Sequence, residues 1–378
     1  NWDDQFDATS SRKPQGDARL PILSPQTAAY AEAGINDYRN IVARGGWPRV
    51  NATQRLKVGV TDNSVRELRR RLQVSGDMNR NTGESSTFDT FLDAGLKRFQ
   101  TRHGMVADGV MGNYTLAALN VDAVTRLNQL ETNLVRLRAM SGFLGERFVM
   151  VNIPGTELEA VRNGRVERRH KTIVGRTDRE TPVLSSKIHE VILNPYWTSP
   201  KSIIEKDIIP LMRKDPTYLT RNKIRLFDSE GNEVPPELVD WSTNEAVNLR
   251  FRQDPGKINA MSSTKINFHN EHAVYMHDTP QQSLFGKCLR FESSGCVRIQ
   301  DIRELTTWLL STDSGNTRTQ IEEIIASRES TPIQLNEPVP VYFVYISAWS
   351  TGDGVVHFRD DIYNRDGVGV LETASTSL

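Results

Sequence analysis

The sequence predicts an α+β multidomain fold, in which a mainly antiparallel β-sandwich with an inserted cap is joined to a small three-helix domain and a helical scaffold. Before residue 140, apolar residues recur at the spacings of three and four that are typical of amphipathic helices. From Arg147 onward they form short strand-like runs that are separated by turns, with few helices between them. Strands that follow one another in this way favour an antiparallel sheet, so we expect helices and strands to occupy separate domains.

The helical part contains two long helices and three short ones. The first long helix starts after Ser24 and stops at Gly45, and Asp122 caps the second. We expect these two helices to pair as a scaffold, because an amphipathic helix needs a partner for its apolar face. Between them, residues 54–120 predict a compact module of three short helices, the last of which follows a turn at Gly109.

The strand part begins with a hairpin and is interrupted once. An Asn-Gly pair at 163–164 predicts a two-residue turn between early strands. Residues 201–262 replace the strand pattern with short helical runs and prolines, and we interpret them as an insertion, since a passive surface loop of this length is unusual. Two helices, 302–311 and 319–327, precede a last buried strand at 339–346.

The two ends of the chain differ in character. The C-terminal tail keeps Phe358, Ile362 and Tyr363 close together, which an exposed tail rarely does, whereas the N-terminal segment is polar. The predicted organisation is therefore a disordered N-terminal segment (1–20), a scaffold helix (21–53), the three-helix domain (54–120), a connecting helix (121–145), the β-rich domain (146–346) with its cap (201–262), and a tail (347–378) packed on the body.

The composition excludes several classes of function. The 47 basic and 47 acidic residues cancel, whereas a general nucleic-acid-binding protein carries a basic excess. No apolar run approaches the roughly 20 residues that span a bilayer, so we expect no transmembrane segment. The chain begins at Asn1 without an apolar leader, and we interpret it as a mature or trimmed form from which any export signal is missing. No pattern indicates a cofactor.

A cysteine and a histidine stand out as candidate catalytic residues. His277 precedes Cys296 by 19 positions, and a polar stretch between them allows the two side chains to meet. A nearby imidazole is a common device for activating a thiol. Gly295 lets the backbone approach a substrate closely, and the helix expected after Asp301 would favour a negative sulfur through its dipole. The alternative is a small buried residue beside a structural histidine.

The other histidines and the second cysteine have simpler interpretations. His269 and His272 lie near His277, but no carboxylate is patterned with them, so we expect no metal site. Cys288 is interpreted as a loop or packing residue. We expect it and Cys296 to be free thiols, because a disulfide between them would destroy the proposed nucleophile.

The strings His-Asp-Thr-Pro from residue 277 and Ser-Ser-Gly-Cys-Val-Arg from residue 293 resemble the active-site signature of the L,D-transpeptidase family, whose catalytic domain is of the YkuD type. The common family form has a histidine at the position of Ser294. Serine there, the long insertion before His277 and the string Asn-Pro-Tyr-Trp ending at Trp197 are similar to the large YcbB-type branch. Residues 96–116 also resemble the small helical peptidoglycan-binding module; the alternative is a generic helical spacer.

The resemblance implies a set of roles for individual residues. Cys296 is implied as the nucleophile and His277 as the base, with the backbone amides of Gly295, Cys296 and Ser294 stabilising an oxyanion. Arg298 holds either the loop or a stem carboxylate. A backbone carbonyl is expected to orient His277, with the side chain of Asp278 as the alternative. The remaining candidates are the loop residue Ser293 and the substrate-pocket residues Tyr275, Asp278 and Trp197.

The resemblance implies a periplasmic enzyme that acts on peptidoglycan. It would release D-alanine from a tetrapeptide donor stem through a cysteine thioester and form a 3–3 cross-link with an acceptor stem, under a mobile cap at 201–262. Carbapenems are expected to acylate the same cysteine. Three alternatives remain open: an L,D-carboxypeptidase, an enzyme that attaches an outer-membrane protein to peptidoglycan, and a non-enzymatic wall-binding protein, which the intact pair of Cys296 and His277 disfavours.

Overall fold

The computed structural model describes residues 19–142, 144–311 and 317–367. The disorder predicted for 1–20 and the fate of the tail after residue 367 therefore lie mostly outside the described residues. Arg19 is placed, and its carbonyl accepts a hydrogen bond from the Val166 N–H at 2.7 Å. Both predicted long helices are present, as α2 (Pro25–Ala43) and α6 (Ala123–Met140), each capped by the polar side chain before it.

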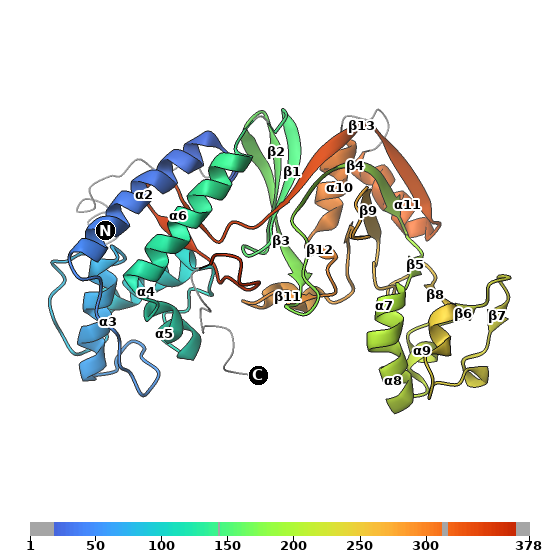
Figure 1. The fold of residues 1–378 in the computed structure, drawn as a ribbon, viewed down its shortest axis with the longest axis horizontal. Coiled ribbons are helices and arrows are strands. Elements are labelled where there is room, and N and C mark those ends of the chain that lie inside the picture. Colours follow the sequence, from blue (N-terminus) through green and yellow to red (C-terminus); the bar gives the residue numbers. More distant parts are fainter. Residues whose placement is uncertain (1–18, 143, 312–316, 368–378) are drawn as a thin grey trace.

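The two long helices lie against each other and cover one end of the β-sheet (Figure 1). Ion pairs between Arg39 and Glu131 and between Arg138 and Glu32 connect them. Their apolar faces share a buried cluster with the outer faces of several strands. Along β1 (Arg147–Asn152), side chains alternate between this cluster and the central core, as expected for a strand buried on both faces.

The three-helix module contains α3 (Asn63–Val74), α4 (Thr90–Arg102) and α5 (Asn113–Leu119) around its own apolar core. Arg102 connects it to the rest of the molecule. Its guanidinium forms a buried ion pair with Asp77 at 2.6 Å and donates to the Val356 carbonyl at 3.2 Å. The described tail, with β14 (Ala348–Ser350) and β15 (Val356–Phe358), is thus held between module and scaffold.

The central sheet has nine strands in the order β11-β3-β12-β10-β9-β4-β13-β1-β2, and β3 also pairs with β2. The α+β class and the mainly antiparallel pairing are confirmed; three pairs are parallel, β1 with β13, β10 with β12 and β11 with β3. The two layers expected of a sandwich are joined, because β3 (Arg165–Gly175) pairs with β2 (Glu157–Arg162) through its first half and with β12 (Val297–Ile299) through its second.

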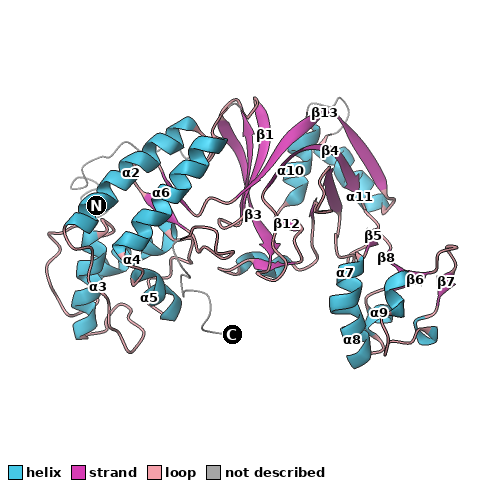
Figure 2. Cartoon of the chain, viewed as in Figure 1, coloured by secondary structure: helices cyan, strands magenta, loops and turns pink. Residues whose placement is uncertain are grey.

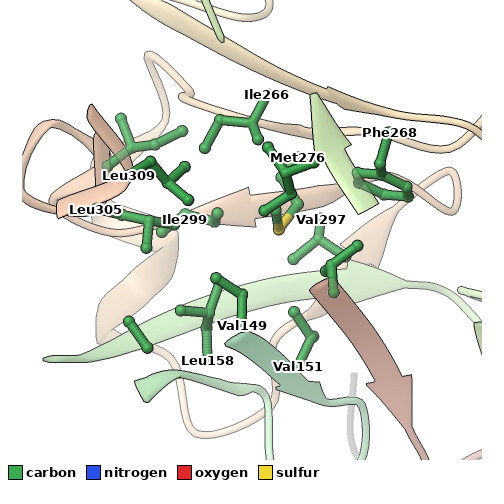
Figure 3. Packing of buried hydrophobic residues seen from close by; sticks show 14 of the residues in the cluster. Val149, Val151, Leu158, Ile266, Phe268, Met276, Val297, Ile299, Leu305 and Leu309 are labelled. Atoms are coloured by element: carbon green, nitrogen blue, oxygen red, sulfur yellow. The ribbon is translucent and has the colours of Figure 1, made fainter. Parts of the chain in front are cut away.

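The remaining strands and two helices complete this core. The predicted turn at 163–164 joins β2 and β3, with both residues at positive φ. Helices α10 (Ile302–Leu310) and α11 (Arg318–Ser327) pack their apolar faces on the sheet (Figures 2 and 3). The other strands are β4 (Leu184–Leu193), β9 (Thr264–Phe268), β10 (Met276–His277), β11 (Phe291–Ser293) and β13 (Thr331–Val344).

The insertion forms a small body with a core of its own, beside the sheet (Figure 1). The short helical runs predicted around 203–207 and 211–215 form one continuous segment: α7 (Lys201–Ile203), the π-helical turn η1 (Ile204–Ile208) and α8 (Ile209–Lys214). Pro210 has no N–H and cannot donate the helical hydrogen bond to the carbonyl four residues earlier. The wider π-helical turn η1 lies just before it and accommodates this lost bond. A four-stranded sheet accompanies them, in the order β5 (Trp197–Thr198), β8 (Arg250–Gln253), β6 (Ile224–Phe227) and β7 (Glu233–Val234).

Helix α9 (Tyr218–Arg221) and the 3₁₀ turns η2 (Pro236–Leu238) and η3 (Glu245–Asn248) complete the insertion, and η4 (Gln282–Gly286) lies in the loop after His277. Within the described ranges, no helix has the length and apolar character needed to cross a bilayer.

Candidate active site

Cys296 lies in the tight turn between β11 and β12. Gly295 before it has φ +109°, a conformation that strains any residue with a Cβ. A Cβ at this position would also lie 3.4 Å from the carbonyl oxygen of Glu180. The Thr181 hydroxyl donates to the Gly295 carbonyl at 2.8 Å, so the neighbouring loop fixes the turn from outside. Cys296 itself remains partly accessible and is a free thiol, as is the exposed Cys288.

The backbone amides of this turn differ from the expectation. Ser293, which is buried, donates its hydroxyl to the Cys296 carbonyl at 2.6 Å and accepts a hydrogen bond from the Gly295 N–H at 3.2 Å. The Gly295 N–H is thus used within the turn and does not face a substrate. The Cys296 N–H donates to no protein atom in the described part of the chain. Of the three amides expected to bind an oxyanion, the structure thus uses that of Gly295 within the turn and leaves that of Cys296 free.

His277 is buried on β10, opposite Lys265 on β9 and beside Arg298 on β12. Its Nδ1 lies 2.6 Å from the backbone carbonyl oxygen of Asp278. Because a carbonyl only accepts, Nδ1 carries the proton and Nε2 keeps its lone pair. Burial, with the nearby charges of Arg298 and Lys265, lowers the pKa of His277 to about 3, so the imidazole is neutral at pH 7.

The carboxylate of Asp278 has other partners than His277. It accepts hydrogen bonds from the Ser263 hydroxyl at 2.6 Å, the Thr279 N–H at 2.8 Å and the Gln282 amide at 3.2 Å. Of the two acceptors considered for His277, the structure therefore has the backbone carbonyl. Asp278 is also buried and fully bonded, which argues against its predicted contact with substrate.

The thiol of Cys296 is neutral in this structure. Burial raises its pKa, and hydrogen bonds with the backbone and side chain of Tyr275, with smaller effects of the Lys265 and Arg298 charges, oppose the increase. The expected contribution of a helix dipole is absent, since β12 separates Cys296 from α10. Asp301 does not cap that helix through its side chain as expected, because it adopts a left-handed conformation.

In the described residues, no hydrogen bond joins His277 and Cys296. Such bonds often form only in the complex with substrate. The structure thus brings together two neutral groups, a thiol and an imidazole, rather than a preformed ion pair.

Tyr275 connects the nucleophile to the insertion. Its ring lies 5.4 Å from that of His277, which confirms that the two side chains share a face of the strand, and Lys265 Nζ lies 4.4 Å from the ring centroid. Burial, together with the neighbouring Cys296, raises the pKa of the Tyr275 hydroxyl, and the indole of Trp197 on its other side opposes the increase. Trp197 is buried in the core of the insertion, so it acts on the site through Tyr275 and does not form an open pocket wall.

Arg298 and Ser294 lie at the rim of the site. Arg298 donates to the Gln281 side-chain oxygen at 2.8 Å and thus holds the loop that follows His277. Ser294 is exposed and accepts a hydrogen bond from Arg179 at 3.0 Å. Lys265 and Arg179 were not predicted, because each reaches the site through strand register or a loop contact that no local pattern indicates.

Replacing Lys265 by methionine is expected to slow alkylation of Cys296 several-fold at mildly alkaline pH. Methionine keeps the apolar stem but removes a charge that lowers the thiol pKa, so the thiolate fraction falls. Iodoacetamide labelling of the Cys296 peptide as a function of pH measures the change. Lys187→Met is the matched control, since exposed Lys187 lies on β4 about 16 Å from the residue paired with Lys265. Equal alkylation rates in Lys265→Met and Lys187→Met would show that the charge of Lys265 does not lower the pKa of the Cys296 thiol.

His269, one of the histidines that lie near His277 in the sequence, has a different histidine as its neighbour. His269 stacks on His189, with ring centroids 4.2 Å apart, and not near His277. In residues 19–142, 144–311 and 317–367, no group of three or more His, Cys, Asp and Glu side chains has a geometry that holds a metal ion.

Two family models and a curated protein match parts of the chain. Residues 146–339 match the family model YkuD, described as "L,D-transpeptidase catalytic domain", and residues 61–119 match the model PG_binding_1, described as "Putative peptidoglycan binding domain". A curated protein of Haemophilus influenzae named "Putative L,D-transpeptidase" is 35% identical over 239 residues, which are 63% of this chain and 48% of that protein. The chain therefore spans about half the length of this relative.

Solved structures of L,D-transpeptidases resemble the chain at low sequence identity. The enzyme from Mycobacterium smegmatis has 12% identity and a TM-score of 0.27, with 53% of this chain and 58% of that chain covered. The enzyme from Xylanimonas cellulosilytica has 15% identity and a TM-score of 0.25, with 78% and 99% covered. The match to the YkuD family model extends over more than half of the chain and contains both His277 and Cys296. The chain thus belongs to the family of proteins that carry a YkuD-type L,D-transpeptidase catalytic domain.

Proposed function

We propose that this protein is a peptidoglycan L,D-transpeptidase of the YcbB-type branch, which forms 3–3 cross-links through a thioester on Cys296. One observation carries the proposal. The accessible thiol of Cys296 lies in a fixed turn directly before β12, and the neighbouring strand β10 carries the buried, neutral imidazole of His277, whose Nε2 is free. A nucleophile and a base on adjacent strands are the elements that acyl transfer requires.

In the first half-reaction, Cys296 attacks the carbonyl between the third residue of the donor stem and its terminal D-alanine. The thiol proton passes to Nε2 of His277 as the carbon–sulfur bond forms, since neither group is charged beforehand. The Cys296 N–H binds the oxyanion, with positive potential from Lys265 and Arg298. His277 then gives the proton to the departing amine, the carbon–nitrogen bond breaks, D-alanine leaves, and the thioester remains.

In the second half-reaction, an amine of the third residue of an acceptor stem attacks the thioester. His277 accepts a proton from this amine, the new amide bond forms and the carbon–sulfur bond breaks. The proton returns to the sulfur, so that thiol and imidazole regain their starting states. No cofactor is needed for either half-reaction.

The other parts of the chain fit a protein that works on the cell wall. We propose that the module at 54–120 localises the enzyme on peptidoglycan, that the body at 201–262 caps the site, and that the protein acts in the periplasm. The matching peptidoglycan-binding family model at 61–119 supports the first of these.

Incubation with purified disaccharide-tetrapeptides is expected to give a cross-linked dimer whose mass equals two substrates minus one D-alanine. Mass spectrometry of the products, with fragmentation to locate the new bond, distinguishes the alternatives. A trimmed tripeptide would indicate an L,D-carboxypeptidase, and turnover only with an added outer-membrane protein would indicate a protein-tethering enzyme. No product with any acceptor would contradict the proposed function.

A further inference from the structure

Arg179 connects the insertion to the turn that carries Cys296. It lies in the loop between β3 and β4, and its Nη2 donates to Asp207 Oδ1 at 2.9 Å. Its Nη1 donates to the second carboxylate oxygen of Asp207 and, at 3.0 Å, to the hydroxyl of Ser294. Asp207 belongs to η1 of the insertion, and Ser294 precedes Cys296 by two residues. One guanidinium thus joins three segments that are distant in sequence.

The contact has the features of a specific connection rather than of a chance surface pair. The Arg179 side chain is 13% exposed and that of Asp207 is 33% exposed. Both carboxylate oxygens are engaged by separate nitrogens, which is the geometry that makes arginine–carboxylate pairs strong and directional. Asp207 also lies in a π-helical turn, a distortion that frequently occurs at functional sites.

The loop that carries Arg179 is held firmly from the other side. The Thr181 hydroxyl accepts a hydrogen bond from the Gly175 N–H at 2.8 Å and donates to the Gly295 carbonyl. The Tyr363 hydroxyl, from the tail, donates to the Gly175 carbonyl at 2.6 Å and accepts from the Thr181 N–H at 3.2 Å. These four bonds fix the loop that carries Arg179. Arg179 therefore provides a direct connection through which a displacement of the insertion can reach Ser294.

Neither partner needs this contact for its own folding. The insertion has a separate apolar core around Phe251, and the turn at Gly295 is fixed by Ser293 and Thr181. We propose that Arg179 is a positioning residue, a clasp that couples the placement of the insertion over a bound stem to the geometry of residues 294–296. This inference rests on the proposed function and adds a determinant of turnover that lies outside the Cys296–His277 pair.

Replacing Arg179 by alanine is expected to lower kcat for cross-linking by about tenfold or more, because small displacements of reacting groups cost this much. The melting temperature and the rate of iodoacetamide labelling at Cys296 should stay near the wild-type values, since a small reagent does not need the insertion. Arg225→Ala is the matched control, because Arg225 makes a similar double ion pair with Glu233 and Asp254 elsewhere in the insertion. Equal kcat in the two variants would overturn the proposal.

A double-mutant cycle tests whether the two segments are coupled. If Arg179 acts through Asp207, the double variant Arg179→Ala/Asp207→Ala should lose little more kcat than either single variant. Multiplicative losses, or a loss of thiol labelling in parallel with kcat, would overturn the clasp. The proposed function is tested separately, by whether the wild-type protein forms cross-links at all. The clasp is tested by the ratio of kcat in each variant to kcat in the wild-type protein.

Hydrogen–deuterium exchange provides a readout that does not depend on turnover. In Asp207→Ala, peptides covering 291–298 are expected to exchange several-fold faster than in Arg225→Ala, although the substitution lies in the insertion. Unchanged exchange in this segment would overturn the clasp even if the enzyme has a different substrate.

Discussion

Replacing Cys296 by alanine is expected to abolish cross-linking and to remove the covalent adduct formed with a carbapenem. The thioester requires this sulfur, and no second thiol lies in the turn between β11 and β12. Alanine keeps the small volume of the residue, and the hydrogen bond from Ser293 to the carbonyl at this position does not involve the side chain. The fold should therefore persist. Intact-mass spectrometry and peptide mapping measure the adduct, and circular dichroism measures the fold.

Cys288→Ala is the matched control for this experiment. Cys288 is exposed, lies eight residues earlier in the segment before β11, and receives the same substitution. The control should retain both turnover and a one-to-one adduct on the Cys296 peptide. The opposite pattern, an inactive Cys288 variant and an active Cys296 variant, would show that the nucleophile has been assigned wrongly.

Replacing His277 by alanine is expected to slow thioester formation by roughly 10²-fold or more, the effect of losing a positioned base. The physical reason is that burial keeps the Cys296 thiol neutral, so that the attack needs an acceptor for its proton. Rapid-mixing mass spectrometry of carbapenem acylation measures this step directly. His272→Ala is the control, since this exposed residue lies in the turn before β10 and interacts weakly with Glu271, at 3.6 Å. A similar rate in both variants would remove His277 from the mechanism.

The same variant should change how stability depends on pH. The pKa of His277 lies at about 3 in the folded protein and near its ordinary value of 6.5 in the unfolded chain. The unfolded state therefore binds the proton first, and the stability that this residue contributes is complete above pH 6.5 and is lost as the pH falls toward 3. The free energy of unfolding should decrease more steeply over this range in wild type than in His277→Ala. Parallel curves would show that His277 is not kept neutral by the fold.

Local signals predicted the parts of the fold that form locally. Ser24 and Asp122 cap α2 and α6 with their own side chains, and the Asn-Gly pair at 163–164 reverses the chain at the expected place. The closure of the sheet through β3 was not predictable in this way. It depends on which strands the two halves of β3 meet, and those partners lie at residues 157–162 and 297–299.

The candidate site shows the same division between local and distant effects. Two short strings indicated His277, Cys296 and Gly295, and the period of the strand placed Tyr275 beside His277. The partners that control their charge come from elsewhere. Lys265 faces His277 only because of the register of β9 with β10. The Gly295 N–H donates to the Ser293 hydroxyl, and this bond depends on the rotamer of Ser293, which no sequence motif indicates.

The hydroxyl of Tyr363 contacts the active-site region from a part of the chain that is synthesised after Cys296. This group bonds Gly175, 188 positions earlier, at the start of the loop whose Thr181 hydroxyl donates to the Gly295 carbonyl. A nascent chain that ends before residue 363 already contains Cys296 but lacks the bonds of Tyr363 to Gly175 and Thr181. Synthesis thus produces the nucleophile first and this outer contact last, so that a chain terminated before residue 363 keeps the bonds of Ser293 and Thr181 to the turn but lacks the bonds of Tyr363 to the neighbouring loop.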